Sequence, residues 1–210
     1  MKTRLLSALL AAAALAASGC AQSFVAAIHS SAEAPPSGRL LPLRVGLLVT
    51  DETRNYLFVA KVPFGQWQYP FGRDLPTVAE QTLSGIFEQV TPIETRDYAS
   101  YDLIVEPRFD PAGTSVDLSI SRCRVVVAMT FEASDASGVK WSKLVSGEVE
   151  TGGGINEMRA RHGQAVSKAV LAAALAMRAE LGPAASAVPE QRAEPKAAQE
   201  NWWAKPASTP

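Results

Sequence analysis

The chain has 210 residues, of which 47% are hydrophobic, and its 20 basic and 21 acidic side chains give a formal net charge of −1. This near balance, without a block of Lys and Arg, argues against a nucleic-acid-binding protein, because such proteins gather positive charge on one surface. The length suits one domain with tails.

The first twenty residues carry the pattern of a secretory signal that ends in a lipidation site. A positive start, an apolar run over residues 5–17 and small residues before Cys20 mark a signal peptide, and the run is too short to span a membrane. The sequence before Cys20 resembles the site cut by lipoprotein signal peptidase. That resemblance implies removal of residues 1–19 and acylation of Cys20, including a palmitate. An ordinary signal peptide cut elsewhere is the alternative.

The residue after the acylated cysteine indicates where such a lipoprotein resides. In enterobacterial sorting, Asp at this position retains a lipoprotein in the inner membrane, and here the position holds Ala21. The resemblance therefore implies an anchor in the inner leaflet of the outer membrane, through acyl chains on Cys20, with the domain facing the periplasm of a Gram-negative cell.

Two segments of low complexity flank the expected domain at 40–182. Residues 20–39 are rich in Ala and Ser and end in a Pro-Pro pair, which predicts a flexible tether behind the lipidated cysteine. Residues 183–210 are rich in Ala, Pro and Gln, which predicts a disordered tail.

The first half of the domain is expected to form two strands, a loop and a helix. Residues 43–49 are a nearly continuous β-rich apolar run that predicts a strand, and residues 57–62 predict a short second one. Residues 63–72 combine two Pro and two Gly with four aromatic residues, which is typical of a loop. Apolar residues at three- and four-residue spacing over 75–90 predict an amphipathic helix that Pro92 ends.

The next stretch is expected to form a strand and a long hairpin. Residues 103–109 predict a strand, in which Pro107 indicates an edge position or a bulge. The alternation of apolar residues then changes phase at residues 121–122, which predicts a bulge or a bend. A hairpin over residues 124–149 follows, with its turn at 135–138.

A second amphipathic helix is expected over residues 156–181, and Gly182-Pro183 is a strong stop signal. Two amphipathic helices on one face of a mixed four- to five-stranded sheet give a two-layer α+β sandwich.

This order of elements behind a lipidation site resembles a group of small Gram-negative outer-membrane lipoproteins. The group includes the lipopolysaccharide-assembly lipoprotein LptE, the penicillin-binding-protein activator LpoB, the curli secretion lipoprotein CsgG and the Pel-polysaccharide lipoprotein PelC. The resemblance covers roughly residues 40–181 and concerns the pattern of elements rather than a residue motif. It implies a non-enzymatic role in docking to, plugging or assembling larger machines, several of them oligomeric.

Residues suited to catalysis or metal binding are few. The histidines are His29, in the tether, and His162, which is expected to be a solvated helix residue beside two arginines. Cys123 lies in an apolar strand and is expected to be buried, with an intermolecular disulfide as the alternative. Two separated histidines and one free thiol do not make a zinc set, and the motifs of hydrolases are absent. No cofactor, metal site or enzymatic activity is therefore predicted.

Two aromatic clusters are the candidate partner-binding residues. Exposed aromatic side chains are typical anchors of protein interfaces and membrane surfaces, so a docking patch for a protein, a glycan or lipid headgroups is one interpretation. For the cluster in the loop, the alternative is a segment that folds back over the open end of the core. For the pair in the tail, the alternative is chance. The residues are Phe64, Trp67, Tyr69, Phe71, Trp202 and Trp203.

Together these features predict a lipid-anchored accessory protein of the cell envelope. The first hypothesis is a non-enzymatic scaffold or accessory subunit of an assembly, secretion or export machine, with a protein partner and a possible homo-oligomer. Its recognition surfaces would be the aromatic loop and an exposed sheet edge. The alternative is a lipid-anchored binding module for a glycan or a small apolar ligand. A periplasmic hydrolase built on His162 is the third and least supported hypothesis.

Overall fold

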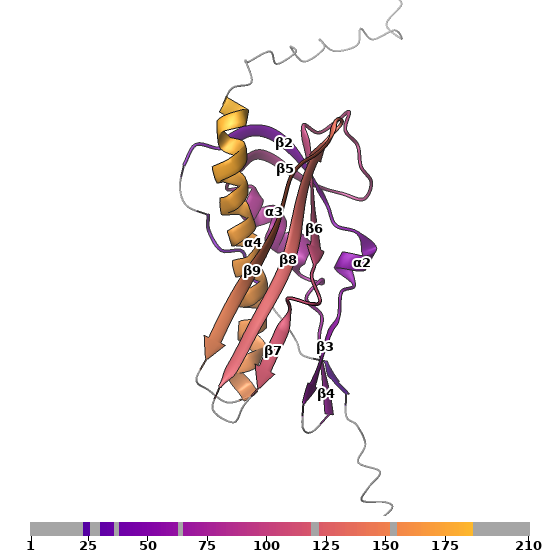
Figure 1. Cartoon of the computed structure of the whole chain (residues 1–210), viewed down its shortest axis with the longest axis vertical. Helices are drawn as coiled ribbons and strands as arrows, with labels where there is room; N and C mark the ends of the chain where they lie inside the picture. The colour runs from indigo at the N-terminus through magenta and orange to yellow at the C-terminus, as the bar shows by residue number, and fades with distance from the viewer. Residues whose placement is uncertain are drawn as a thin grey trace, which may run out of the picture.

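The computed structural model describes residues 23–25, 30–35, 38–62, 65–118, 122–151 and 155–186, and the structural statements below concern these residues. Figure 1 shows the arrangement of the elements. In chain order they are β1 (Ser23–Val25), β2 (Leu41–Leu48), α2 (Asp51–Arg54), β3 (Phe58–Val62), β4 (Gly65–Tyr69), α3 (Leu75–Leu83), β5 (Phe87–Ile93), β6 (Leu103–Phe109), β7 (Ser115–Leu118), β8 (Cys123–Asp135), β9 (Gly138–Thr151) and α4 (Ile155–Ser186).

The predicted α+β class is confirmed. A mixed six-stranded sheet has the order β5-β2-β6-β8, and β9 pairs with one edge of β8 along its whole length. β6 and β7 share the other edge of β8, one after the other. α4 packs on β8, β9 and β2, and α3 packs on β2 and against α4, so both helices cover one face of this sheet (Figure 1).

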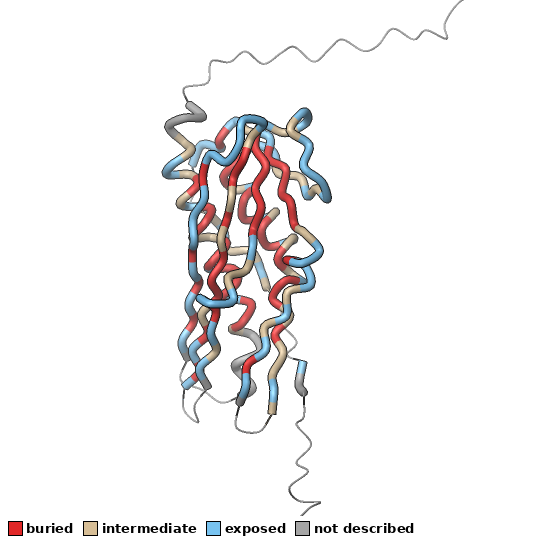
Figure 2. Tube along the Cα trace, turned by 45° about the vertical axis from the view of Figure 1, so that its right-hand side comes forward, coloured by how far each residue is buried: buried red, intermediate tan, exposed pale blue. Residues whose placement is uncertain are grey.

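The hydrophobic core lies between this face and the two helices. Along β8 the odd-numbered residues from Cys123 to Ala133 are buried in the core, whereas the even-numbered ones alternate onto the opposite face. Figure 2 shows the buried residues concentrated along the central strands. The predicted burial of Cys123 is confirmed, and burial raises the pKa of its thiol.

The strand predictions at 43–49, 57–62 and 103–109 and the hairpin prediction at 124–149 agree with β2, β3, β6 and the β8–β9 pair. β2 pairs with β6 only from Leu103 to Val105, and Pro107 lies beyond this paired part of β6. Its carbonyl accepts a hydrogen bond from the hydroxyl of Thr53 at 3.2 Å on that side. Among the described strands none pairs with β6 at Pro107 on that side, so the missing proline N–H is tolerated there, as predicted.

The predicted helix over 75–90 is too long. α3 ends at Leu83, and the chain from Phe87 onwards forms β5, which pairs in parallel with β2. Ser84-Gly85 separates the two elements, and Gly is a poor residue with which to continue a helix. Pro92, expected to end the helix, instead lies inside an edge strand, where a missing N–H is tolerated.

The segment predicted as a loop contains a strand. β4 pairs antiparallel with β3 and parallel with β1, which makes a second, three-stranded sheet in the order β1-β4-β3. The alternation of apolar and polar residues explains why this segment forms a strand. Trp67 and Tyr69 point to one side of β4, while Gln66 and Gln68 point to the other. The short helix α2 was not predicted.

The phase change at residues 121–122, predicted as a bulge or a bend, lies between β7 and β8, and residue 121 is outside the described residues. β7 and β8 are antiparallel neighbours, with Leu118 opposite Cys123. A hairpin resets the inward face of the second strand, and this explains why the apolar residues change from even to odd numbers.

α4 continues to Ser186, through the predicted stop at Gly182-Pro183. Just before this point, Glu180 accepts hydrogen bonds from the indole of Trp141 at 2.8 Å and from Lys143 at 3.1 Å. These tertiary contacts stabilise the last turns, whereas the proline opposes the helix through a lost hydrogen bond and a clash of its ring with the preceding turn. Within the described chain, no helix is both long enough and apolar enough to cross a membrane.

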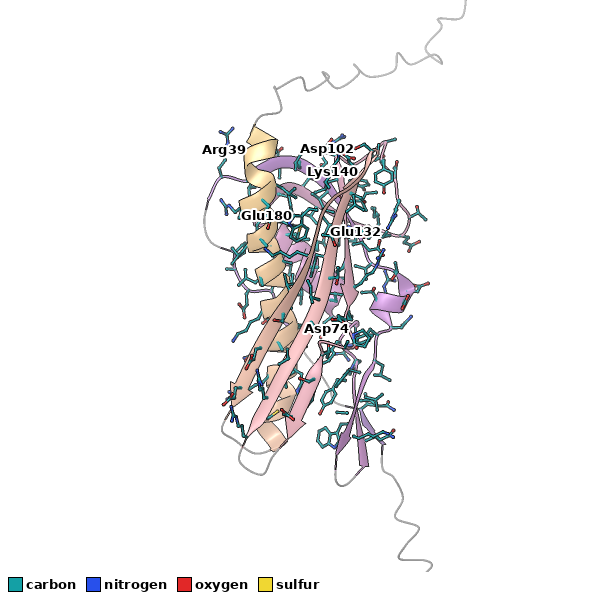
Figure 3. The ribbon with its side chains drawn as sticks, in the orientation of Figure 1. Arg39, Asp74, Asp102, Glu132, Lys140 and Glu180 are labelled. Atoms are coloured by element: carbon teal, nitrogen blue, oxygen red, sulfur yellow. The ribbon has the colours of Figure 1, made fainter. Side chains whose placement is uncertain are left out.

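The described part of the predicted tether lies on the domain. The N–H of Ser30 donates to Asp74 at 3.1 Å, the carbonyl of Ser31 accepts from Ser167 at 2.6 Å, and the carbonyl of Arg39 accepts from Arg178 at 3.1 Å. We call residues 30–35 and 38–40 the strap. Figure 3 shows Arg39 beside the upper end of α4 and Asp74 much lower. These contacts correct the prediction of a free tether for this part of 20–39.

Ser167→Ala is expected to lower the free energy of unfolding by about 1 kcal/mol, because the hydroxyl bonds to the strap carbonyl of Ser31 and to its own helix at Gly163. Denaturation in urea would measure it. Gln164→Ala, at an exposed position of the same helix, is the control and is expected to change stability little. Equal effects of the two substitutions would show that the strap contact does not contribute.

Candidate functional site

The structure divides the predicted aromatic cluster into buried and half-buried residues. Tyr69 and Phe71 are 0% and 1% exposed, and Trp67 is half-buried against the core. Burial removes Tyr69 and Phe71 from any exposed docking surface and favours the alternative, in which the segment covers the core. The other predicted site residues, Cys20, Phe64, Trp202 and Trp203, lie outside the described residues.

His162 is part of this buried aromatic cluster, which corrects the prediction of a solvated histidine. It is 0% exposed, and its ring stacks on that of Tyr69 with centroids 4.2 Å apart and an interplanar angle of 14°. The ring of Phe71 follows at 6.3 Å from His162. Burial raises the pKa of the Tyr69 hydroxyl. The stack therefore joins the three-stranded sheet to α4.

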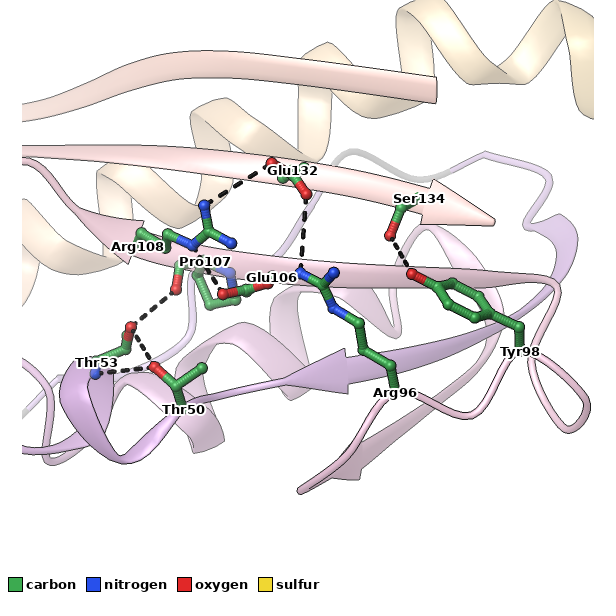
Figure 4. A network of polar contacts seen from close by, with 9 residues as sticks. All are labelled: Thr50, Thr53, Arg96, Tyr98, Glu106, Pro107, Arg108, Glu132 and Ser134. Atoms are coloured by element: carbon green, nitrogen blue, oxygen red, sulfur yellow. Dashed lines mark hydrogen bonds and ion pairs between the residues drawn. The ribbon is translucent and has the colours of Figure 1, made fainter. Parts of the chain in front are cut away.

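A set of four charged side chains lies on the sheet face away from the helices. In the pairing of β6 with β8, Glu106 stands directly opposite Glu132. Two carboxylates in such a position would repel each other. Arg108 donates to Glu106 at 2.7 Å, and Arg96, which follows β5, bonds to the other oxygen of Glu106 (Figure 4). Both arginines lie 3.8–3.9 Å from Glu132.

Glu106 is the buried centre of this charge cluster, which consists of Arg96, Glu106, Arg108 and Glu132. Its side chain is 6% exposed, whereas those of Arg96 and Arg108 are 43% and 50% exposed. Burial alone would raise the pKa of Glu106, but the hydrogen bonds from Arg108 and Arg96 outweigh it and hold the pKa below its usual value. Glu106 is therefore ionised and paired at neutral pH.

Glu106→Gln is expected to lower the free energy of unfolding at pH 7 by about 1–2 kcal/mol, since it removes two charged hydrogen bonds whose arginines are half in water. The folded-state pKa is lowered, so this stabilisation is present above the unfolded value of about 4.3 and is lost as the pH falls through the folded value. Urea denaturation between pH 7 and pH 3, with exposed Glu94→Gln as the control, would measure it. An acid dependence equal to that of the unsubstituted protein would contradict the assignment.

Beside the charge cluster, a pocket of about 500 Å³ opens between α2 and the end of β6. The rings of Tyr56 and Phe109 stack in its wall with centroids 4.5 Å apart. Thr50 caps α2 by accepting from the N–H of Thr53 at 3.2 Å, and the Thr53 hydroxyl donates to the carbonyl of Pro107, so both hydroxyls are held in place. The lining residues are Thr50, Glu52, Thr53, Tyr56, Glu106, Arg108, Phe109 and Pro111.

Hydroxyls, carboxylates, one guanidinium and two rings equip this pocket for hydrogen bonding and stacking, and its lining includes neither His nor Cys. Sequence reasoning did not find it. Glu106 and Arg108 flank Pro107 on one face of β6, and this pair of opposite charges was the feature of the sequence that could have indicated the pocket. Among the described residues, no group of three or more His, Cys, Asp or Glu is placed to hold a metal ion.

Comparison with known proteins returned structures only. No family model matches the chain, and no curated protein matches it. Among similar solved structures, a protein of the DUF330 family from Xanthomonas campestris has a TM-score of 0.47 at 11% identity and covers 73% of this chain and 93% of its own. A minor lipoprotein from Acinetobacter baumannii has a TM-score of 0.41 at 10% identity, over 70% of this chain and 95% of its own.

A dodecamer of PelC from Paraburkholderia phytofirmans is similar with a TM-score of 0.35 at 16% identity, over 66% of this chain and 92% of its own. PelC belongs to the group named in the sequence analysis, and the resemblance to all four of its members stays a prediction. At these identities and scores the similarities carry no conclusion about activity or partners.

Proposed function

We propose that this chain is an outer-membrane lipoprotein, anchored through Cys20 on the periplasmic side, that acts as a non-enzymatic scaffold or accessory subunit of an envelope assembly, secretion or export machine. The observation that carries the proposal is the lipidation site, in which small residues precede Cys20 at the end of an apolar run. The composition of the pocket, with fixed hydroxyls and paired charges, supports binding rather than nucleophilic chemistry.

Burial of Tyr69 and Phe71 leaves a sheet edge as the described candidate for protein recognition. β9 is 14 residues long and forms one edge of the six-stranded sheet. It carries two exposed apolar side chains, Val139 at 57% and Leu144 at 58%. The opposite edge strand, β5, contains Pro92, which interrupts strand addition. Subunit or partner pairing is therefore expected along β9.

Membrane flotation of the full-length protein and of Cys20→Ser tests the anchor. The unsubstituted protein should float with outer-membrane vesicles and carry acyl chains detectable by mass spectrometry, whereas Cys20→Ser should do neither. Light scattering on the protein then tests pairing, since Leu144→Lys should dissociate a multimer that forms along β9. A soluble, unacylated protein would contradict the anchor, and a monomer that recovers no outer-membrane partner in pull-down would contradict the scaffold.

A ligand-binding module is the second candidate, and the pocket is the observation that favours it. Stacked Tyr56 and Phe109 beside hydroxyls and Arg108 resemble the surfaces on which sugars bind, with one ring face and several hydrogen bonds. A ligand at one hundred times its Kd should stabilise the protein by about 2.7 kcal/mol. Thermal unfolding with envelope oligosaccharides would show this, and Arg108→Ala should abolish the stabilisation.

A further inference from the structure

The start of the mature chain is tied to the domain by β1. In the parallel pairing of β1 with β4, Ser23 stands beside Gln66, and Val25 stands beside Gln68. β4 is held in turn by β3 and by the stacking of Tyr69 on His162 of α4. A membrane anchor upstream of β1 therefore pulls on a fixed point of the fold.

The link between the anchor and this point is short. Only two residues separate Cys20 from Ser23, and a fully extended chain advances at most about 3.6 Å per residue, so the two lie within about 11 Å of each other. A link of this length cannot let the domain turn over on the membrane.

The direction of β1 selects one end of the molecule. Because β1 runs parallel to β4, Ser23 lies at the beginning of β4, next to the β3–β4 connection. Figure 1 shows β3, β4 and the end of β7 at the lower end of the molecule, while α4 runs from that end to the upper one. We call the lower end, which includes Ser23, Gln66 and Lys61, the anchor end.

We propose that the anchor end faces the phospholipid surface and that α4 rises away from it, so that the domain stands upright on the membrane. This proposal rests on the acylation of Cys20 in the proposed function. The exposed surface of the small sheet fits a headgroup layer, since Lys61 carries a positive charge and Val25 is 66% exposed. Anionic headgroups attract basic residues close to the surface.

An upright domain also places the C-terminal end of α4 far from the anchor. A helix of 32 residues is about 48 Å long, at 1.5 Å per residue. Trp202 follows Ser186 by 16 residues, which reach about 54 Å only when fully extended. The segment that carries Trp202 and Trp203 therefore begins at the end of the domain opposite the anchor.

Depth-dependent fluorescence quenching tests this orientation on the full-length acylated protein. In a Cys123→Ala background, single cysteines replace Gln66 at the anchor end or Ser137 at the exposed β8–β9 turn, and each is labelled with the same fluorophore. The protein is reconstituted into vesicles of phosphatidylethanolamine and phosphatidylglycerol that contain a headgroup nitroxide lipid. The label at 66 should be quenched several-fold more strongly than the label at 137.

An insertion distinguishes the short link from other causes. About twelve Gly and Ser residues between Ala21 and Gln22 add a flexible span of about 19 Å, which should reduce quenching at 66 to the level at 137 while flotation persists. Equal quenching at 66 and 137 without the insertion would overturn the orientation. Quenching at 66 unchanged by the insertion would contradict the role of the short link, because the surface of the anchor end would then hold the domain on the membrane by itself. Failure of the acylated protein to float would instead contradict the anchor, and so the proposed function.

Discussion

Phe71→Ala is expected to lower the free energy of unfolding by about 4 kcal/mol. Phe71 is 1% exposed and its ring centroid lies 6.0–6.3 Å from those of Tyr69, Phe109 and His162. Truncation leaves a cavity where elements from three parts of the chain meet. Urea denaturation followed by circular dichroism would measure the loss.

The matched control for Phe71→Ala is Gln66→Ala, because Gln66 lies in the same aromatic segment with an exposed side chain. It should change stability by less than about 0.5 kcal/mol. If Phe71→Ala were as stable as the control and instead lost a binding partner, the segment would be a docking patch. That outcome would contradict the burial of Phe71.

Gly147→Ala is expected to lower the free energy of unfolding by about 3 kcal/mol, because the added methyl group would displace α4 from the sheet. A Cβ at Gly147 would lie 2.0 Å from the carbonyl oxygen of Ala165 and 2.5 Å from the amide nitrogen of Ala169. Both atoms belong to the helix backbone, which cannot rotate away as a side chain can. Relief therefore requires a shift of the whole helix. Calorimetry would show a lowered Tm and unfolding enthalpy.

Ser146→Ala controls for the change in strand propensity next to Gly147. Ser146 is exposed, so its alanine variant should unfold close to the unsubstituted protein. A Gly147→Ala protein as stable as Ser146→Ala would mean that α4 does not approach β9 as closely as described.

Local patterns were sufficient for some of the strands and insufficient where two patterns overlap. Alternation and apolar runs located β2, β6 and the β8–β9 hairpin, because these depend on which residues face the core. Over residues 75–90, helical spacing continued into Phe87 and Val90, which belong to β5. Parallel pairing with β2, more than 40 residues earlier in the chain, decided the conformation of that segment.

The candidate site was harder to predict because its parts meet only in the fold. His162 lies close to Arg159 and Arg161 in the sequence, a charged context that predicted solvent, yet Tyr69 from a distant strand covers it. The charge cluster likewise joins Arg96 from a loop, Glu106 from β6 and Glu132 from β8. No local spacing signals such a set, although opposite charges at alternate positions of one strand were a visible hint.

The strap also constrains the order in which the chain can fold. The bond between Ser31 and Ser167 joins residues 136 positions apart, and the bond between Arg39 and Arg178 joins residues 139 apart. These two contacts of the strap therefore form only after α4 has formed. Contacts between residues so far apart slow folding, because closing the long loop between them lowers the chain entropy before the contact itself contributes any stability. Docking of the strap should thus appear as a late kinetic step, after the sheet and α4 have come together.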